Sequence, residues 1–172
     1  MDLTQKELSA LRKLATKKGR REQGRFLIEG VRCVKELISS DYECERMIIC
    51  RNLLTETGKS FLISVKTYPL YELTTRKFKQ ITHEKSSQGI IAVARATDLT
   101  SLDYGPTELV IVVQKMSDPS NLGSIIRSAV AFGAKILIGP ESAELYSPKV
   151  ISASSGYLFK AQIKLANDIP ME

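Results

Sequence analysis

The strongest constraint on the fold is a continuous apolar run, residues 109–113, which reads Leu-Val-Ile-Val-Val. Behind it the apolar spacing predicts a helix over 122–132 and a short strand at 135–138. A helix near 148–154 and a strand at 158–164 are expected next. Strands without a polar face that alternate with helices are typical of a parallel sheet covered on both sides. We therefore expect an α/β domain in this half of the chain.

The amino-terminal half has a different pattern, in which the expected short strands and helices alternate irregularly. Thr4 and Glu7 have the spacing of a capping box, which predicts a helix that ends near Gly19. The other expected elements are strands at 25–28, 46–50, 61–65 and 89–94 and helices at 30–39 and 74–80. The polar, turn-rich segment 97–107 is the expected linker. The predicted organisation is thus a domain over 1–96, a linker over 97–107 and a second domain over 108–172.

The positive charge of the chain is concentrated at its start. Residues 1–35 hold ten Lys and Arg against four acidic residues, which equals the net charge of +6 of all 172 residues. A basic loop over 17–24 carries Lys17, Lys18, Arg20 and Arg21. Such a local excess suits a phosphate-backbone partner, and a solvated helix face explains it equally well. Composition alone leaves both interpretations open.

Several function classes find no support in the sequence. No apolar stretch reaches the roughly 18 residues of a membrane helix, and the first residues form no export signal. The three cysteines include no Cys-x-x-Cys pair, and His83 has no companion at ligand spacing. We expect reduced thiols in a cytoplasmic protein, with no metal site and no membrane contact.

The segment 116–134 contains the most informative residues. It follows the first apolar strand, at the strand end where α/β folds bind ligands. Asn121 is the expected helix N-cap. One face of the helix is expected to face the core, and it is formed by Leu122, Ile125, Ile126, Ala129 and Gly133. The opposite face is small and polar apart from one long cation, Arg127. By spacing alone, an Asn cap with one exposed Arg is the preferred interpretation. The four residues expected on that outer face are Ser120, Ser124, Arg127 and Ala131.

The run from Asp118 to Arg127 resembles the first signature of the SpoU family of knotted RNA methyltransferases, in its TrmH branch. The family pattern is an Asn, a Gly two residues later, an Arg six residues after the Asn, and a closing Phe-Gly-Ala. This chain has Asn121, Gly123, Arg127 and the tripeptide 132–134. The resemblance implies a SPOUT fold, of the trefoil-knot type, for the second domain.

Two further segments carry the resemblance. Residues 145–159 resemble the second signature, including its Ala-Ser-x-Gly core at 153–156, although Ser152 stands where many relatives have a basic residue. The stretch 25–30 and the stretch 87–93 resemble the RNA-binding domain of ribosomal-protein L30 type. The resemblance thus favours RNA as the partner of the basic amino terminus.

The resemblance implies a ribose 2′-O-methyltransferase that uses S-adenosylmethionine, acts on rRNA or tRNA and forms a homodimer. It implies a catalytic role for Arg127, by positioning and charge stabilisation, and a role for Asn121 in holding Arg127 or the target nucleotide. The RNA contacts that we expect are Lys17, Lys18, Arg20, Arg21, Arg25 and Ser124.

The family continues beyond its second signature to a third one, which builds the cofactor pocket. We therefore expect the cofactor-binding residues to lie beyond Glu172. Two explanations stay open, a fragment of an ordinary methyltransferase, which we favour, and a short RNA-binding relative without catalysis. A nucleotide-binding α/β enzyme is disfavoured, because the chain has neither a Gly-x-x-x-x-Gly-Lys-Ser/Thr loop nor a Gly-x-Gly-x-x-Gly turn.

Overall fold

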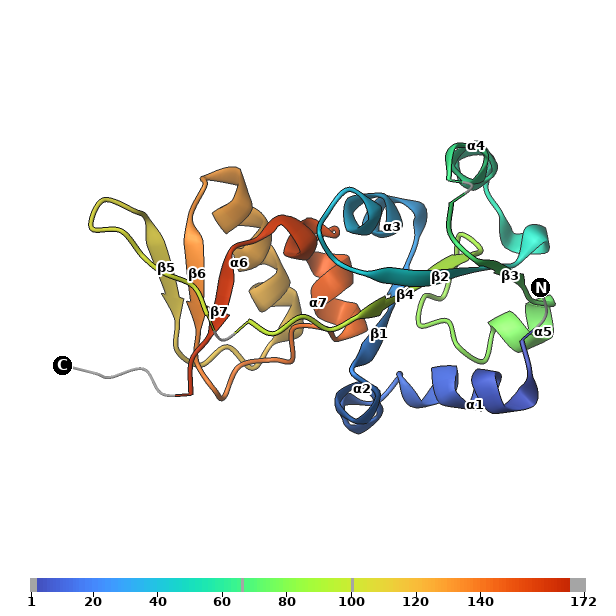
Figure 1. Cartoon of the computed structure of the whole chain (residues 1–172), viewed down its shortest axis with the longest axis horizontal. Coiled ribbons are helices and arrows are strands. Elements are labelled where there is room, and N and C mark those ends of the chain that lie inside the picture. Colours follow the sequence, from blue (N-terminus) through green and yellow to red (C-terminus); the bar gives the residue numbers. More distant parts are fainter. Residues whose placement is uncertain (1–2, 66, 100, 168–172) are drawn as a thin grey trace. The chain divides into compact units, whose positions relative to one another are not determined.

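The structure, a computed structural model, describes residues 3–65, 67–99 and 101–167 (Figure 1). The chain divides into two compact units, residues 1–96 and 97–172. The division falls where the expected linker begins. Residue 100 of that linker and residues 168–172 of the expected second domain lie outside the described residues. Within the described residues, no helix has the length and apolar character needed to span a membrane.

The first unit is built on a four-stranded sheet of order β1-β4-β2-β3. Its central strand β4 pairs antiparallel with β1 and β2, and β3 runs parallel to β2. The first five residues of β4 are buried, so this strand forms the middle of the core. The strands are β1 (Arg25–Glu29), β2 (Cys44–Ile49), β3 (Leu70–Glu72) and β4 (Ile90–Arg95).

Helices cover both sides of this sheet. Figure 1 shows α1, α2 and α5 on one side and α3 and α4 on the other. On the first side Leu11 and Leu14 share a buried cluster with Phe78 and Ile81. The helices are α1 (Gln5–Lys13), α2 (Lys17–Gln23), α3 (Val31–Ile38), α4 (Glu56–Ser64) and α5 (Thr75–Phe78), and a 3-10 turn, η1 (Arg51–Leu53), follows β2.

The predicted capping box is confirmed, but the predicted end of the first helix is wrong. The hydroxyl of Thr4 accepts a hydrogen bond from the Glu7 N–H, and the Glu7 side chain accepts one from the Thr4 N–H. Helix α1 ends at Lys13, and the expected basic loop is the helix α2, capped by Thr16. Gly19 lies inside α2 and does not end a helix. The position requires glycine because a Cβ would stand 2.0 Å from the Lys13 oxygen.

One predicted strand is also wrong, and one strand was not predicted. Residues 61–65, an apolar run, lie largely in α4, which Thr55 caps by accepting a hydrogen bond from the Gly58 N–H at 3.1 Å. Only one side of this helix is buried, so Phe61 packs inward and Ile63 is 71% exposed. The strand β3 has three residues at the sheet edge and is too short to show a period.

The second unit contains a three-stranded parallel sheet of order β5-β6-β7, which confirms the predicted α/β class. The strands are β5 (Val110–Val113), β6 (Lys135–Ile138) and β7 (Ile163–Leu165). Helix α6 (Pro119–Ala131) connects β5 to β6, and α7 (Pro148–Ala153) lies between β6 and β7. Each predicted helix of this unit is therefore present.

Two details of the second unit differ from expectation. Figure 1 shows α6 and α7 on the same side of the sheet, so the described helices do not cover both faces. Val112 is accordingly 55% exposed. The predicted strand 158–164 is a 3-10 turn, η2 (Tyr157–Lys160), followed by the shorter β7. The turn forms because Gly156 takes a left-handed conformation, with φ of 82°.

The closest packing in this unit is the contact of α6 with α7. Gly123 lies on the buried side of α6, where a Cβ would stand 2.5 Å from the Ala153 Cβ and 2.9 Å from the Val150 oxygen. Both neighbours belong to a helix whose backbone cannot move without shifting the core. Only glycine permits this approach.

Gly123→Ala is therefore expected to destabilise the second unit by about 1–3 kcal/mol, because the added methyl group overpacks the helix contact. The measurement is the free energy of unfolding from urea titration. Ser124→Ala, on the exposed face one residue later, is the matched control and should change stability little. Equal midpoints for the two variants would contradict the close contact.

Candidate functional site

The loop between β5 and α6 is fixed by a cap that the sequence did not identify correctly. Asp118, not Asn121, is the N-cap: its Oδ1 accepts a hydrogen bond from the Asn121 N–H at 2.7 Å. Pro119 occupies the first turn, where a missing N–H costs nothing. Asn121 thus lies inside the first turn of α6 with its side chain exposed. Its amide is free of the capping role and can face a ligand.

The outer face of α6 is arranged as predicted. Ser120, Ser124 and Arg127 are exposed, as is Ala131, while Leu122, Ile126 and Ala129 are buried. The Ser124 hydroxyl donates to the Ser120 carbonyl at 2.9 Å, so its remaining lone pairs point outward as acceptors. Arg127 is the one cation of this helix. The face therefore offers a guanidinium among small groups that allow close approach.

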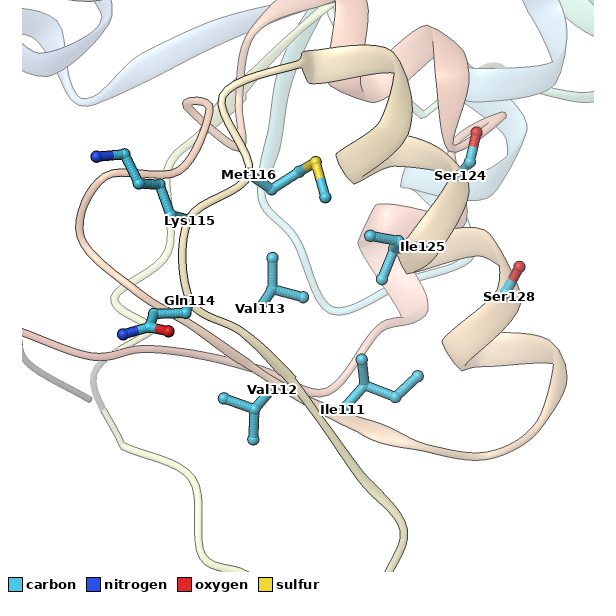
Figure 2. A pocket seen from close by; sticks show the side chains of 9 residues that line it. All are labelled: Ile111, Val112, Val113, Gln114, Lys115, Met116, Ser124, Ile125 and Ser128. Carbon is cyan, nitrogen blue, oxygen red and sulfur yellow. The ribbon is translucent and has the colours of Figure 1, made fainter. Parts of the chain in front are cut away.

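A groove lies beside this face, between α6 and the end of β5, with a volume of about 630 Å³. Figure 2 shows Ile125 pointing from α6 toward the strand, while Ser124 and Ser128 point away from it. Arg127 is not among the lining residues, so the structure does not bring it into the groove. The lining is Ile111, Val112, Val113, Gln114, Lys115, Met116, Ser124, Ile125 and Ser128.

The two signature segments of the sequence are in contact. Gly123 belongs to the first, and its neighbours Val150, Ala153 and Ser154 belong to the second. Ser154 is fully buried, and its hydroxyl donates to the Ile151 carbonyl at 3.0 Å. The small residues of the second segment are thus explained by the approach of α6. Ser152, where relatives often have a basic residue, is exposed.

In the first unit, the predicted RNA contacts separate into exposed and engaged cations. Lys17, Lys18 and Arg21 are exposed on α2. Arg20 is only 7% exposed, and its Nη1 donates to the carbonyls of Leu14 at 2.8 Å and Ala15 at 3.1 Å. The Arg20 side chain therefore holds the end of α1, and its contact with RNA stays a prediction.

Arg25 is also engaged within the protein. Its Nε lies 2.8 Å from Glu45 Oε1, and the Arg95 Nε approaches the same oxygen at 2.8 Å. Burial raises the pKa of Glu45, but the hydrogen bonds from Arg95 and Arg25 outweigh it and hold that pKa below its ordinary value. Arg25 therefore joins β1 to β2 through Glu45, and its contact with RNA stays a prediction.

The two units differ in charge. The first holds nineteen Lys and Arg against eleven acidic residues, a net charge of +8, and the second has a net charge of −2. A long-range attraction for a polyanion thus belongs to the first unit. No group of three or more possible metal ligands occurs among the described residues. Burial raises the pKa of Cys33 and of Cys44 to about 11, which makes these thiols poor nucleophiles and poor metal ligands.

Comparison with known proteins agrees with this geometry. Residues 108–170 match the model of the SpoU rRNA Methylase family, and residues 6–92 match that of the MRM3-like substrate binding domain. The chain belongs to the SpoU rRNA methylase family, with an MRM3-like substrate-binding domain before the methylase domain. The family resemblance expected from the sequence is confirmed.

Relatives extend the comparison. The 23S rRNA (guanosine(2553)-2′-O)-methyltransferase RlmP of Bacillus subtilis is 27% identical over 158 residues, which cover 91% of this chain and 60% of that protein. A crystal structure of an RNA 2′-O ribose methyltransferase has a TM-score of 0.80 and 30% identity, covering 95% of this chain and 63% of the other. The SpoU methyltransferase AviRb from Streptomyces viridochromogenes, crystallised with its cofactor AdoMet, has a TM-score of 0.83 at 20% identity, covering 96% and 64%. The curated relatives that match most of this chain are longer, and it spans 34% to 60% of their length.

Arg20→Ala is expected to destabilise the first unit by about 1–3 kcal/mol, because two carbonyls at the end of α1 lose a charged donor. Arg21→Ala removes the same kind of side chain from an exposed position and is the matched control, with an expected change within about 0.5 kcal/mol. Urea titration measures both. An Arg20→Ala variant with the same free energy of unfolding as the unmodified protein would contradict this structural role.

The triple variant Lys17→Ala, Lys18→Ala and Arg21→Ala is expected to bind RNA more weakly and with a flatter salt dependence. Each lost phosphate contact lowers the slope of log K against log salt by about 0.7–0.9. Filter binding at several salt concentrations measures this slope. Arg51→Ala with Lys59→Ala, both in surface ion pairs of the same unit, is the control. A slope equal to that of the control would mean that the α2 cations are only a solvated surface.

Proposed function

We propose that the protein transfers a methyl group from S-adenosylmethionine to a ribose 2′-hydroxyl of rRNA. The observation that carries the proposal is the outer face of α6, where Arg127 stands exposed among Ser120, Ser124 and Ala131. This residue occupies the Arg position of the SpoU signature. The names of the relatives point to the same reaction on ribosomal RNA.

The chemistry requires activation of a poor nucleophile. When bound, S-adenosylmethionine would supply an electrophilic methyl group, and its sulfur would leave as a neutral thioether as the sulfur–methyl bond is replaced by a bond to the ribose 2′-oxygen. The proton of the hydroxyl would pass to solvent. A guanidinium keeps its own proton, so Arg127 serves by orienting the ribose and by stabilising the negative charge that grows on the 2′-oxygen. Its planar fork can bind the adjacent phosphate at the same time.

Asn121 has a separate role. Six residues separate it from Arg127, which is about 9 Å along a helix axis. In the described part of the chain no hydrogen bond joins the two side chains. We therefore favour contact of the Asn121 amide with the target nucleotide over the alternative that it holds Arg127. Ser124, one turn from either residue, offers a hydroxyl oxygen to the same RNA.

The groove beside α6 is a weak fit for the cofactor. Its lining combines apolar side chains of β5 with two hydroxyls and the cation Lys115, and includes no carboxylate that could hold the ribose hydroxyls or balance a sulfonium charge. The Lys115 ammonium is moreover paired with Glu141. We assign none of these residues to S-adenosylmethionine.

A homodimer is the assembly that we propose, as the family resemblance implies. Large apolar side chains remain exposed on the second unit, and they support an interface there. Phe132 is 79% exposed, and Leu109 is 57% exposed. Such side chains are commonly covered by another protein surface.

Arg127→Ala in the full-length gene product is expected to lower the rate of methyl transfer by roughly 10²–10³-fold, because the charge that develops on the oxygen loses its partner. The measurement is incorporation of labelled methyl groups into 23S rRNA from an undermethylated source. Lys149→Ala, an exposed cation of α7, is the control and should retain the rate.

Arg127→Lys keeps the charge but lacks the fork, and an intermediate rate is expected. Near-normal turnover of Arg127→Ala would move the chemistry to another residue. Absence of methyl transfer in the unmodified protein, together with no heat of S-adenosylmethionine binding, would favour the RNA-binding relative without catalysis.

A further inference from the structure

The carboxylate of Glu29, at the end of β1, holds an entire loop. It accepts hydrogen bonds from the backbone N–H groups of His83 at 2.9 Å and Glu84 at 3.3 Å. The hydroxyls of Thr82 and Ser87 donate to its other oxygen. One carboxylate thus accepts four hydrogen bonds from a single loop, whereas a solvent-facing glutamate can be satisfied by water.

The far end of this loop is fixed as well. The Gln88 Oε1 accepts a hydrogen bond from the Val31 N–H, at the start of α3, at 2.8 Å. Because β1 pairs with β4, Glu29 lies opposite Ile91, next to the point where the loop returns to the sheet. Both ends of residues 82–88 are thus tied to the core of the first unit, and the loop is ordered before any partner arrives.

The loop held by Glu29 carries exposed side chains of different chemistry. His83, Lys85 and Ser86 all face solvent. An imidazole ring can stack on an unpaired base, and an ammonium can bind phosphate. Partial burial lowers the pKa of His83, and the charge of Glu29 opposes that shift. None of the three side chains contributes to the buried core.

The loop adjoins the basic corner formed by α1 and α2. Phe78 and Ile81, just before the loop, pack with Leu11 and Leu14 of α1. The Arg12 Nη1 donates to the Gln80 Oε1 at 3.4 Å, which gives a second contact between α1 and the same segment. The segment that leads into the loop thus packs on α1, in a unit with a net charge of +8.

We propose that residues 83–86 contact the substrate RNA, with Lys85 at a phosphate and His83 against a base, and that Glu29 is the positioning residue that holds them in place. This proposal rests on the proposed function, because it assumes an RNA substrate. It adds a second contact surface to the exposed cations of α2. A protein partner is the other occupant that such a loop could have, and the net positive charge of the unit favours RNA.

The test uses the full-length protein and in vitro transcribed 23S rRNA in filter binding at several salt concentrations. Lys85→Ala removes the direct contact, and Lys59→Ala, on α4 at the other side of the sheet, is its matched control. Glu29→Gln replaces one of the two acceptor oxygens that hold the loop by an NH2 group and removes the charge, and Glu72→Gln, exposed on β3, is the corresponding control. Thermal midpoints are recorded for all four variants.

Lys85→Ala is expected to lower the salt slope by about 0.7–0.9, as one lost phosphate contact requires. Glu29→Gln is expected to weaken binding roughly tenfold, because an unordered loop must be ordered on binding. In the double variant, which combines Lys85→Ala with Glu29→Gln, the loss of affinity should be smaller than the sum of the two single losses, because both changes act on one loop. The two controls should bind as the unmodified protein does.

Unchanged affinity and slope for both Lys85→Ala and Glu29→Gln, with RNA binding by the unmodified protein intact, would overturn this proposal alone. If the unmodified protein binds no RNA, the proposed function fails with it. Should Glu29→Gln unfold, Lys85→Ala decides the matter, because this exposed side chain can be removed without disturbing the core. A loss of stability in Glu29→Gln with full RNA affinity would mean a structural loop only.

Discussion

The contact of α6 with α7 at Gly123 is the constraint on which the functional site depends. A Cβ there would meet Ala153 at 2.5 Å, so the two helices lie as close as backbones allow. Leu122 and Ile126 of α6 are fully buried, and with the contact at Gly123 they fix the rotation of this helix. The rotation in turn decides which side chains face outward. Ser124, Arg127 and Ala131 remain on the exposed face of α6.

The same sorting of polar groups operates in the first unit. Gly19 lets α2 approach α1, and Arg20 then donates to two carbonyls at the end of α1. One cation is thereby used to hold the helix corner, which leaves Lys17, Lys18 and Arg21 exposed. The number of basic residues in this segment of the sequence therefore overestimates the positive charge that is exposed to RNA. The carboxylate of Glu29 is used in a comparable way, to order a loop that carries exposed side chains.

Much of this could be predicted from the sequence, and the errors have physical causes. The capping box at Thr4 and the strand over the apolar run of β5 follow from local signals and are confirmed, but the expected cover on both faces of that strand is not, since Val112 is 55% exposed. Residues 61–64 form the end of helix α4 because the Thr55 cap and the packing of Phe61 outweigh a short apolar run. Asp118 and Asn121, three residues apart, both fit the pattern of an N-cap, and only the hydrogen bond from the Asn121 N–H to Asp118 shows which of them is the cap. The burial of Arg20 depends on how two helices meet, which no local pattern records.

The central claim is that a SpoU-family fold with an exposed Arg127 modifies ribose in ribosomal RNA. Its most direct test is a map of 2′-O-methylated nucleotides in rRNA from cells with and without the gene, by resistance of the modified linkage to alkaline cleavage. We expect one protected linkage to disappear when the gene is deleted and to return with the unmodified gene. Identical maps, or the loss of a base methyl group with every ribose methyl group retained, would contradict the account.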